Sequence, residues 1–325
     1  MNSLEEYKNL IEDSIIKYSS GTKPENLHDS IRYILSLGGK RIRPILVLMG
    51  YGVYNDHVER ALHQALAIEL FHNFTLIHDD IMDRADLRRG NLTVHKKWNE
   101  PTAILSGDLM LIKAYELLCD APAHLVQPML QAFNTMATEV CEGQQMDMDF
   151  EQRTDLSEEE YIDMIRKKTS VLIGAAIQIG ALRAGADASE AGLLYEFGVN
   201  IGLAFQMLDD YLDVFGQSEK TGKIEGGDVL NRKKTLLFLH CYRHADEQSK
   251  NELLSIYENR SSKSDAEKVH TARELFKKAG SDKYLYQKAE DYYHIGLNLL
   301  KSADFQRERI KPLLTLAEYL MQREN

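Results

Sequence analysis

Two long stretches of the chain carry apolar residues at helical spacing, and the interior of the second is almost entirely apolar. From Val58 to Met82, apolar residues recur at intervals of three and four, which predicts one helix of about seven turns. The second stretch, Ala188 to Phe215, follows Asp187, carries Glu190 in its first turn and stops at Gly216, a pattern typical of helix start and end signals. Because a helix that is apolar on most sides must be buried, we expect this one at the centre of the fold.

The rest of the chain repeats this periodicity in shorter segments. Only six prolines occur, and none lies between Met129 and Lys311, so long uninterrupted helices are possible there. Further helices are predicted for residues 3–18, 27–36, 41–53, 102–119, 123–142, 158–167, 169–182, 229–243, 247–258, 265–278, 284–301 and 312–322. Polar loops are predicted at 84–101, 143–157, 216–228 and 259–264, and the first three contain glycine. Strand alternation is not evident, and no Pro-, Gly- or Ser-rich linker divides the chain. The predicted fold is all-α, a single large bundle of residues 1–325.

The charge balance limits what the protein can bind. The chain has 39 Lys and Arg against 50 Asp and Glu, a net charge of −11, which argues against a broad electrostatic attraction to nucleic acid or to an anionic membrane. Any anionic ligand must therefore be held by a local basic cluster. The longest uncharged run near the middle, Thr169 to Leu182, is too short for the ~20 apolar residues that cross a bilayer, so no membrane span is predicted.

Cysteine usage and the N-terminus predict a cytoplasmic protein. Cys119, Cys141 and Cys241 are far apart, odd in number and form no CxxC pair, which argues against disulfides or a thiolate zinc site. We expect them to be reduced and mostly buried. The first residues have no basic stretch leading into an apolar one, so no signal peptide is predicted.

Each of the two long helices ends in the same acidic motif. Asp79-Asp80-Ile81-Met82-Asp83 closes the first, and Asp209-Asp210-Tyr211-Leu212-Asp213 closes the second. The first and last carboxylates of each motif stand on one helix face a turn apart. A single such motif is as well explained by a solvated acidic helix end, but two motifs on buried helices favour bound cations, because unpaired buried charge is costly. Oxygen ligands without cysteine suit Mg²⁺, which completes its shell with water and substrate phosphate.

Basic clusters lie near both acidic motifs. They are Gly38-Gly39-Lys40-Arg41-Ile42-Arg43-Pro44, Arg88-Arg89-Gly90, Lys167-Lys168-Thr169 and the segment from Lys223 to Lys234. Any one of them is equally well explained as a solvated face. Together with two metal motifs in an acidic protein, they predict binding of diphosphate.

These motifs resemble those of the trans-isoprenyl diphosphate synthases, the polyprenyl synthetase family. The matching pieces occur in the family's order and span most of the chain: GGKRIRP at 38–44, ELFHNFTLIHDDIMDRADLRRG at 69–90, GQQMD at 143–147, KT at 168–169, GLAFQMLDDYLD at 202–213 and GKIEGGDVLNRKKT at 222–235. The resemblance implies an all-α isoprenoid synthase fold with a central cavity. It also implies a homodimer that condenses isopentenyl diphosphate with an allylic diphosphate, with three Mg²⁺ bound beside the substrates.

The resemblance further implies roles for individual residues. The expected Mg²⁺ ligands are Asp79, Asp83 and Asp209, and the two acidic rims are completed by Asp80, Asp210 and Asp213. The expected cations that hold the allylic diphosphate are Arg88, Lys168, Lys223 and Lys233. The expected pocket for isopentenyl diphosphate consists of Lys40, Arg43, His72 and Arg89. Thr169 and Gln206 are expected to face the developing allylic cation, supported by Gln144 and Asp147. The released diphosphate is expected to accept the proton.

Product length is expected to depend on the helix before the first acidic motif. Phe74 lies five residues before Asp79, about 7.5 Å along the helix axis, and in this family an aromatic at that position acts as a floor for the growing chain. Thr75 is not aromatic, and the motif lacks a two-residue insertion, a combination most like geranylgeranyl diphosphate synthases, with farnesyl diphosphate as the next expected product. Phe74 as an ordinary core residue is the alternative.

Three other functions share part of this pattern. A terpene cyclase shares one DDxxD motif, but the second motif here is DDYLD, and the GGKRIRP cluster implies a second diphosphate. A carboxylate-bridged di-iron bundle is suggested by two ExxH pairs, Glu69 with His72 and Glu267 with His270, but further inward glutamates are not evident. A regulatory subunit of a heteromeric synthase predicts a damaged acidic motif, whereas both are intact.

Overall fold

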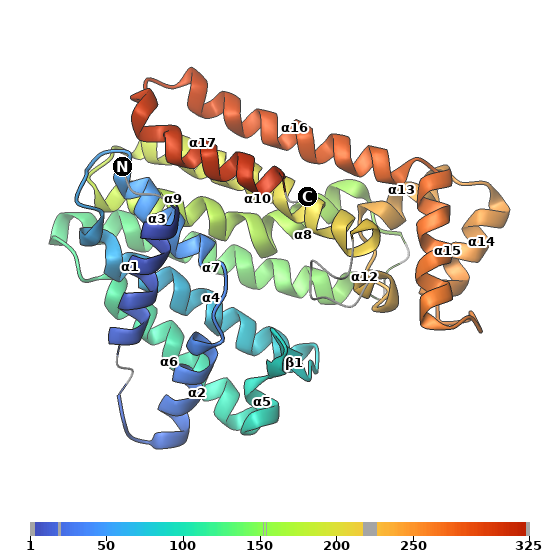
Figure 1. Ribbon diagram of the computed structural model, residues 1–325, viewed down its shortest axis with the longest axis horizontal. Coiled ribbons are helices and arrows are strands. Elements are labelled where there is room, and N and C mark those ends of the chain that lie inside the picture. The colour runs from blue at the N-terminus through green and yellow to red at the C-terminus, as the bar shows by residue number, and fades with distance from the viewer. Residues whose placement is uncertain (1–3, 19–20, 152, 154, 217–225, 323–325) are drawn as a thin grey trace. The chain divides into compact units, whose positions relative to one another are not determined.

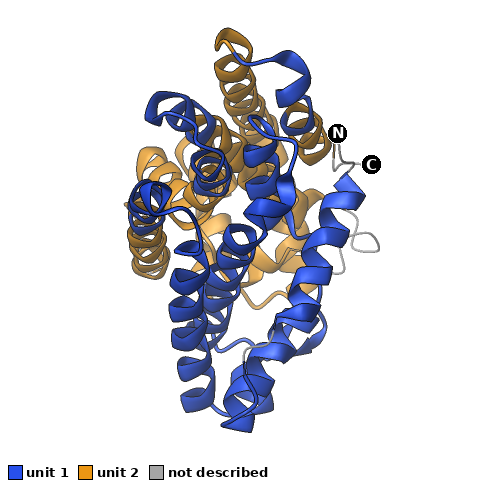
Figure 2. Cartoon of the chain, turned by 90° about the vertical axis from the view of Figure 1, so that its left-hand side faces the viewer, with its two compact units in different colours: residues 1–134, 175–195, 305–313 blue, residues 135–174, 196–304, 314–325 orange. Residues whose placement is uncertain are grey.

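The structure, a computed structural model of the full chain, describes residues 4–18, 21–151, 153, 155–216 and 226–322. The chain folds into two compact units, drawn in different colours in Figure 2. Unit 1 comprises residues 1–134, 175–195 and 305–313, and unit 2 comprises 135–174, 196–304 and 314–325. The boundary falls inside helices α7 (Ala123–Phe150), α9 (Val171–Arg183), α10 (Ala188–Phe215) and α17 (Arg307–Met321). The all-α fold class is confirmed.

Unit 1 is built around α4 (Figure 1). Its complete elements are α1 (Leu4–Lys17), α2 (Glu25–Ser36), α3 (Ile42–Gly52), the 3₁₀ turn η1 (Val58–Ala61), α4 (Leu62–Met82), strands β1 (Leu87–Arg88) and β2 (Asn91–Leu92), α5 (Val94–Lys97) and α6 (Glu100–Leu118). Helix α4 packs against α1, α3 and α6. Ala67, Ile68 and Leu70 are fully buried, so this helix is apolar on several faces and forms the core of the unit.

Unit 2 holds the remaining helices. They are α8 (Glu158–Ile165), the π-helical turn η2 (Arg166–Ser170), α12 (Gly227–Leu230), α13 (Leu236–His244), α14 (Glu247–Tyr257), α15 (Asp265–Lys278) and α16 (Ser281–Ser302). The long helix α16 contacts α13, and its Gly296 lies against Ile201 of α10. By length and composition alone α10 could cross a membrane, but 67% of its apolar window is buried inside the protein. Burial by neighbouring helices explains its composition.

Most predicted helices are present, with differences that have local causes. Asp187 caps α10 as predicted, because its carboxylate accepts hydrogen bonds from Ser189 N (2.8 Å) and Glu190 N (2.9 Å). The helix predicted from Val58 begins as the 3₁₀ turn η1 before α4. The helix predicted at 229–243 is replaced by the short α12 and by α13, with non-helical residues between them.

Two of the loop predictions were wrong in part. Residues 143–150 continue α7, because Gly143 serves close helix packing there and does not end the helix. The predicted loop 84–101 contains α5 and the hairpin β1–β2. The hairpin turn is Arg89-Gly90, and both residues have positive φ (53° and 75°), the geometry that suits a tight turn between two strands.

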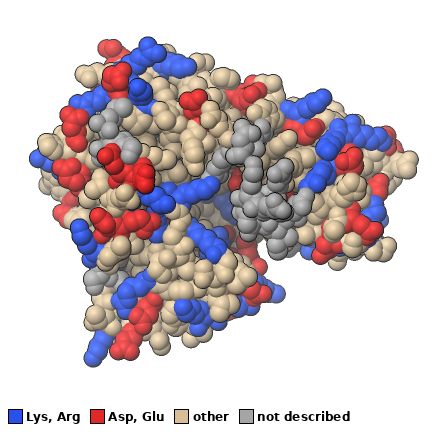
Figure 3. Space-filling model, viewed as in Figure 1, with Lys and Arg blue, Asp and Glu red and all other residues tan. Residues whose placement is uncertain are grey.

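Surface chemistry adds one correction and one observation. Cys241 is buried as expected, but Cys119 and Cys141 are exposed, so the expectation of mostly buried thiols was wrong. Among the described residues on the face drawn in Figure 3, acidic and basic side chains are interspersed and do not form one broad basic surface. Local clusters therefore decide which anions the protein can hold.

Candidate active site

The first acidic motif closes α4 in three different environments. The Asp80 side chain is buried (1% exposed), Asp79 is partly buried and Asp83 is exposed. Asp83 is the residue after the helix, and its N–H donates to the carbonyl of Asp79 (2.8 Å). The helix end therefore carries Asp79 and Asp83 beside each other, as the spacing predicted.

The hairpin after α4 returns a basic residue to this motif. Arg88 donates to Asp80 Oδ1 from Nε (3.1 Å) and from Nη2 (2.6 Å), and Nη2 lies 3.7 Å from Asp79 Oδ2. Burial raises the pKa of the Asp80 carboxyl, and the contact with Arg88 opposes that shift. The predicted diphosphate cation Arg88 is thus held against the acidic motif itself.

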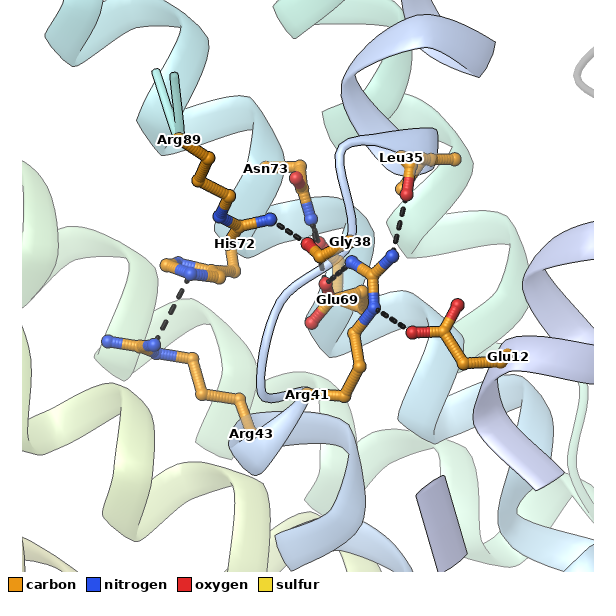
Figure 4. A network of polar contacts seen from close by, with 9 residues as sticks. All are labelled: Glu12, Leu35, Gly38, Arg41, Arg43, Glu69, His72, Asn73 and Arg89. Carbon is orange, nitrogen blue, oxygen red and sulfur yellow. Dashed lines mark hydrogen bonds and ion pairs between the residues drawn. The ribbon is translucent and has the colours of Figure 1, made fainter. Parts of the chain in front are cut away.

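The segment GGKRIRP is anchored by Arg41, which the sequence analysis did not single out. Figure 4 shows its guanidinium between carboxylates of two helices. Nη1 donates to Glu69 Oε1 of α4 (2.5 Å), Nε to Glu12 Oε1 of α1 (2.9 Å), and Nη2 to the carbonyl of Leu35 (2.6 Å). Asn73 Nδ2 also donates to Glu69 Oε1 (3.0 Å). Arg41 thereby ties the start of α3 to three other parts of unit 1.

The four residues predicted to hold isopentenyl diphosphate lie around this anchor. Arg43 Nη1 donates to His72 Nε2 (3.2 Å), and Arg89 donates from Nη1 to the carbonyl of Gly38. The Arg43 Nε is buried and has no hydrogen-bond partner among the described residues. Burial lowers the pKa of Arg43 to about 10. Lys40 is exposed at the same segment.

His72 is neutral in this surrounding. Burial, reinforced by Arg43 and the neighbouring arginines, lowers the pKa of its imidazole well below 6.5. A neutral ring can accept the hydrogen bond from Arg43. The cluster therefore gathers several guanidinium groups with one nearby buried carboxylate, Glu69, an excess of positive charge that favours an anion.

Phe74 lies in a series of aromatic rings in unit 1. Its ring is 5.5 Å from that of Phe71 and 4.9 Å from that of His78, both edge-to-face. Phe71 continues the series to Phe133 at 5.2 Å. The hydroxyl of the neighbouring Thr75 donates to the carbonyl of His72 (2.8 Å). Its hydrogen bond is therefore satisfied within the helix. Phe74 is only partly buried.

The second acidic motif lines a cavity of about 200 Å³ that lies within unit 2. The predicted site residues on its wall are Asp147, Lys168, Thr169, Gln206, Asp209, Asp210, Asp213 and Lys233. Carboxylates and ammonium groups thus meet in one cavity, although they come from segments far apart in the sequence. Tyr161, Asp228 and Lys234 also line it, and the sequence analysis gave them no role.

The predicted pairs of this cavity are in contact. Lys168 Nζ lies 2.5 Å from Asp147 Oδ2, and Thr169 Oγ1 donates to Gln206 Oε1 (3.2 Å). Both Lys168 and Thr169 belong to the π turn η2, and such turns occur often at functional sites. Gln144 lies three residues before Asp147 in α7. Its amide nitrogen is buried and has no hydrogen-bond partner among the described residues.

Asp210 is the most deeply buried carboxyl of the cavity. It accepts hydrogen bonds from the Tyr161 hydroxyl and from Gln206 Nε2 (2.9 Å). Burial, with a further contribution from Asp228, raises its pKa to about 8. Tyr161 is itself buried (2% exposed). The only sequence signal for Tyr161 is an aromatic residue on the apolar side of a predicted helix.

The start of α12 contacts the second motif. Asp213 Oδ2 accepts from the N–H of Asp228 (2.8 Å). Lys234 Nζ donates to the carbonyls of Phe150 (3.2 Å), Glu151 (3.0 Å) and Arg153, which fixes the end of α7 beside Lys233. The predicted diphosphate cation Lys223 lies outside the described residues.

The donor set of the acidic motifs fits Mg²⁺. All candidate ligands are carboxylate oxygens, which suit a hard cation. In the described part of the chain, no group of three or more His, Cys, Asp or Glu side chains forms a complete metal site, and Mg²⁺ usually takes only one or two carboxylates besides water and phosphate. The di-iron alternative does not fit, because Glu69 is bound by Arg41 and Glu267 caps α15 through Ser264.

Known proteins are similar to this chain over nearly its whole length. The sequence profile of the polyprenyl synthetase family matches residues 24–275. The geranylgeranyl pyrophosphate synthase of Geoglobus acetivorans is 37% identical over 318 residues and covers 97% of each chain. A crystal structure of a geranylgeranyl pyrophosphate synthase matches the whole of both chains with a TM-score of 0.95 and 43% identity. A synthase of that name from Corynebacterium glutamicum, complexed with isoprenyl diphosphate and magnesium, is 28% identical with a TM-score of 0.89 and covers 99% of this chain and all of its own.

The family profile covers well over half of the chain, and the relatives match it over nearly their whole length. The chain therefore belongs to the polyprenyl synthetase family. It is a trans-isoprenyl diphosphate synthase, a prenyltransferase, as its ordered motifs predicted.

Proposed function

We propose that this protein condenses isopentenyl diphosphate with an allylic diphosphate, dimethylallyl, geranyl or farnesyl, and releases geranylgeranyl diphosphate as its main product. The observation that carries the proposal is the cavity of unit 2, where Asp209 and Asp213 lie with Lys168 and Lys233. Carboxylates and ammonium groups in one cavity suit an anion bridged by metal ions. The relatives named for geranylgeranyl diphosphate support the choice of product.

The metal assignment rests on the family resemblance and on the carboxylate donors of the two acidic motifs. Enzymes of this family depend on Mg²⁺ in general, and we assign Asp79, Asp83 and Asp209 as its protein ligands, with three ions present when substrate is bound. Mg²⁺, when bound, neutralises the charge of the leaving diphosphate. Asp80, Asp210 and Asp213 complete the acidic rims, and Arg88, Lys168, Lys223 and Lys233 add positive charge around the same diphosphate.

The reaction itself needs no protein nucleophile. The allylic C–O bond breaks with its electron pair on the diphosphate, and the double bond of isopentenyl diphosphate forms the new C–C bond. A proton then leaves the intermediate to the released diphosphate. Thr169 and Gln206 present polar atoms to the cation, while Gln144 and Asp147 support them. Apolar walls such as Met164 and Ile165 keep water away from the cation.

The second substrate is assigned to the arginine cluster of unit 1. Lys40, Arg43, His72 and Arg89 would bind the diphosphate of isopentenyl diphosphate. The buried Arg43 Nε without a partner among the described residues and the lowered pKa values of Arg43 and His72 support an anion here. A diphosphate would supply the missing acceptor and the missing negative charge.

We also propose a cytoplasmic homodimer formed through α6. Leu105 and Ile112 of this helix are 59% and 56% exposed and lie two turns apart on one face. Leu105→Glu and Ile112→Glu should each give monomers in analytical ultracentrifugation. Ile16→Glu, a change at an exposed position of α1 (79%), is the matched control, and dimers that survive both α6 changes would contradict this interface.

The decisive experiment is a product assay. The purified protein is incubated with Mg²⁺, isopentenyl diphosphate and, separately, each of the three primers, and the dephosphorylated products are sized by mass spectrometry. Twenty-carbon products are expected, and fifteen-carbon products would move the assignment to farnesyl diphosphate. No condensation with any primer would indicate a regulatory subunit, and a cyclic hydrocarbon would indicate a cyclase.

Two variants test the metal ligands in the same assay. Asp79→Ala and Asp209→Ala should each abolish turnover while circular dichroism stays that of the wild type, because the carboxylates act on the substrate complex. Turnover that persists in either variant would reject that residue as an essential ligand.

A further inference from the structure

The π turn η2 (Arg166–Ser170) lies between two glycines of neighbouring helices in unit 2. Gly143 of α7 approaches one side of it, since a Cβ atom on Gly143 would lie 2.3 Å from Lys168 N and 2.8 Å from Lys168 Cα. Gly202 of α10 approaches the last residue of the π turn, since a Cβ atom on Gly202 would lie 2.8 Å from both Cα and Cβ of Ser170. Both glycines are buried. No larger residue fits at either position without movement of backbone.

Each glycine lies one helical turn before a side chain that binds the same π turn. Asp147, four residues after Gly143, pairs with Lys168 Nζ (2.5 Å). Gln206, four residues after Gly202, accepts from Thr169 Oγ1 (3.2 Å). Residues four apart share a helix face. Both helices thus hold the π turn at two levels, through backbone contact at the glycine and through a polar side chain one turn later.

We propose that Gly143 and Gly202 form a backbone clamp that positions Lys168 and Thr169 in the cavity of unit 2. A π turn is wider than an α turn and has poorer packing along its axis, so its placement depends on what holds it from outside. The two glycines are positioning residues, because they touch the backbone that carries Lys168 and Thr169 and not the substrate. This inference rests on the proposed function for the roles of these two side chains.

The two sides of the clamp should give different kinetic defects. Gly143→Ala displaces Lys168, which holds diphosphate, so inhibition by inorganic pyrophosphate with Mg²⁺ should weaken together with a fall in kcat. Gly202→Ala displaces the end of the turn beside Thr169, so kcat should fall while pyrophosphate inhibition changes little. A displacement near 1 Å costs about 100-fold in rate. The KM for isopentenyl diphosphate should stay that of the wild type in both variants.

The control is the same substitution in open space. A Cβ atom on Gly192, also in α10, meets nothing within 4 Å, so Gly192→Ala should keep wild-type kinetics and be at least as stable, because alanine favours the helix. Asp147→Asn tests the Gly143 side of the clamp independently. If Gly143 acts by placing Lys168 against Asp147, the double variant should be scarcely worse than the poorer single one. Fully additive losses, or wild-type kinetics in a folded Gly143→Ala protein, would overturn the inference.

Amide hydrogen exchange of the wild-type protein gives a test independent of catalysis and of variant folding. The amides of residues 166–170 should exchange as slowly as those of the adjoining first turn of α9, because the clamp restrains them. Exchange as fast as in exposed loops such as 259–264 would overturn the clamp even in an active enzyme. Conversely, slow exchange in a protein that transfers no prenyl group would retain the clamp and reject the proposed function.

Discussion

The guanidinium of Arg41 and the carboxylate of Glu69 form an ion pair of 2.5 Å, and their side chains are only 1% and 3% exposed. Arg41 also has a left-handed backbone (φ 51°), which is uncommon for a residue with a side chain. The pair connects the start of α3 to α4 beside the cluster of Arg43, His72 and Arg89 (Figure 4). Its burial makes it a determinant of where that cluster lies.

Glu69→Gln should therefore affect both stability and the second substrate. The change leaves the buried Arg41 guanidinium with only the partly exposed Glu12 as a counter-charge, at a cost of up to about 3–5 kcal/mol in the free energy of unfolding. The KM for isopentenyl diphosphate should rise more than kcat falls, because Lys40 and Arg43 lose their placement. Urea unfolding and steady-state kinetics measure the two effects. Glu116→Gln, which removes an exposed pair with Lys113, should cost at most about 1 kcal/mol, and equal effects of both changes would contradict the prediction.

Phe74→Ala should lengthen the product by at least one isoprene unit. Removal of the ring opens space about 7.5 Å before Asp79 along α4, while Phe71 and His78 remain on either side. Mass spectrometry of the dephosphorylated products measures the change. Phe133→Leu is the control, because Phe133 is fully buried beyond Phe71 in the ring series, so this variant should lose stability with unchanged product length. An unaltered product distribution for Phe74→Ala would reject the floor.

His72 should make the substrate-free protein less stable at mildly acidic pH. The unfolded chain protonates this imidazole near pH 6.5, whereas burial and the surrounding arginines lower its pKa in the folded protein. Between the two pKa values the unfolded state binds more protons, so stability falls as the pH drops below 6.5, by at most about 1.4 kcal/mol per pH unit. Urea unfolding from pH 7.5 to 5 should be less steeply pH-dependent for His72→Gln. His124→Gln, at an exposed position, should keep the wild-type slope; equal slopes in all three proteins would contradict the assignment.

Tyr161→Phe should weaken the second acidic motif. The change removes the hydroxyl that donates to Asp210 and leaves a buried carboxyl with one partner fewer, at a cost of about 1–3 kcal/mol. Because Asp210 also holds Gln206, kcat should fall with the KM for isopentenyl diphosphate unchanged. Thermal unfolding and kinetics measure this, and Tyr242→Phe at an exposed position is the comparison. A fully active, equally stable Tyr161→Phe protein would show that the hydroxyl has no such role.

The local sequence pattern was sufficient to predict the helices and the two acidic motifs. Apolar spacing of three and four residues, cap residues such as Asp187 and the DDxxD repeats are signals within one or two turns, and helices form from interactions of that range. The order of the motifs was sufficient for the family. These are properties that the sequence by itself determined.

Tertiary structure decided how residues of one type divide between roles. Arg41 and Arg43 are two positions apart in the sequence. Arg41 forms ion pairs with Glu12 and Glu69, whereas Arg43 has a buried nitrogen with no hydrogen-bond partner among the described residues. Gly143 looked like the start of a loop and is instead a point of close packing inside α7. Tyr161 carried no motif at all. The roles of Arg41, Gly143 and Tyr161 each depend on a partner more than twenty residues away in the sequence. Packing between distant segments sets the environment of a side chain, and the spacing of residues along one helix does not reveal it.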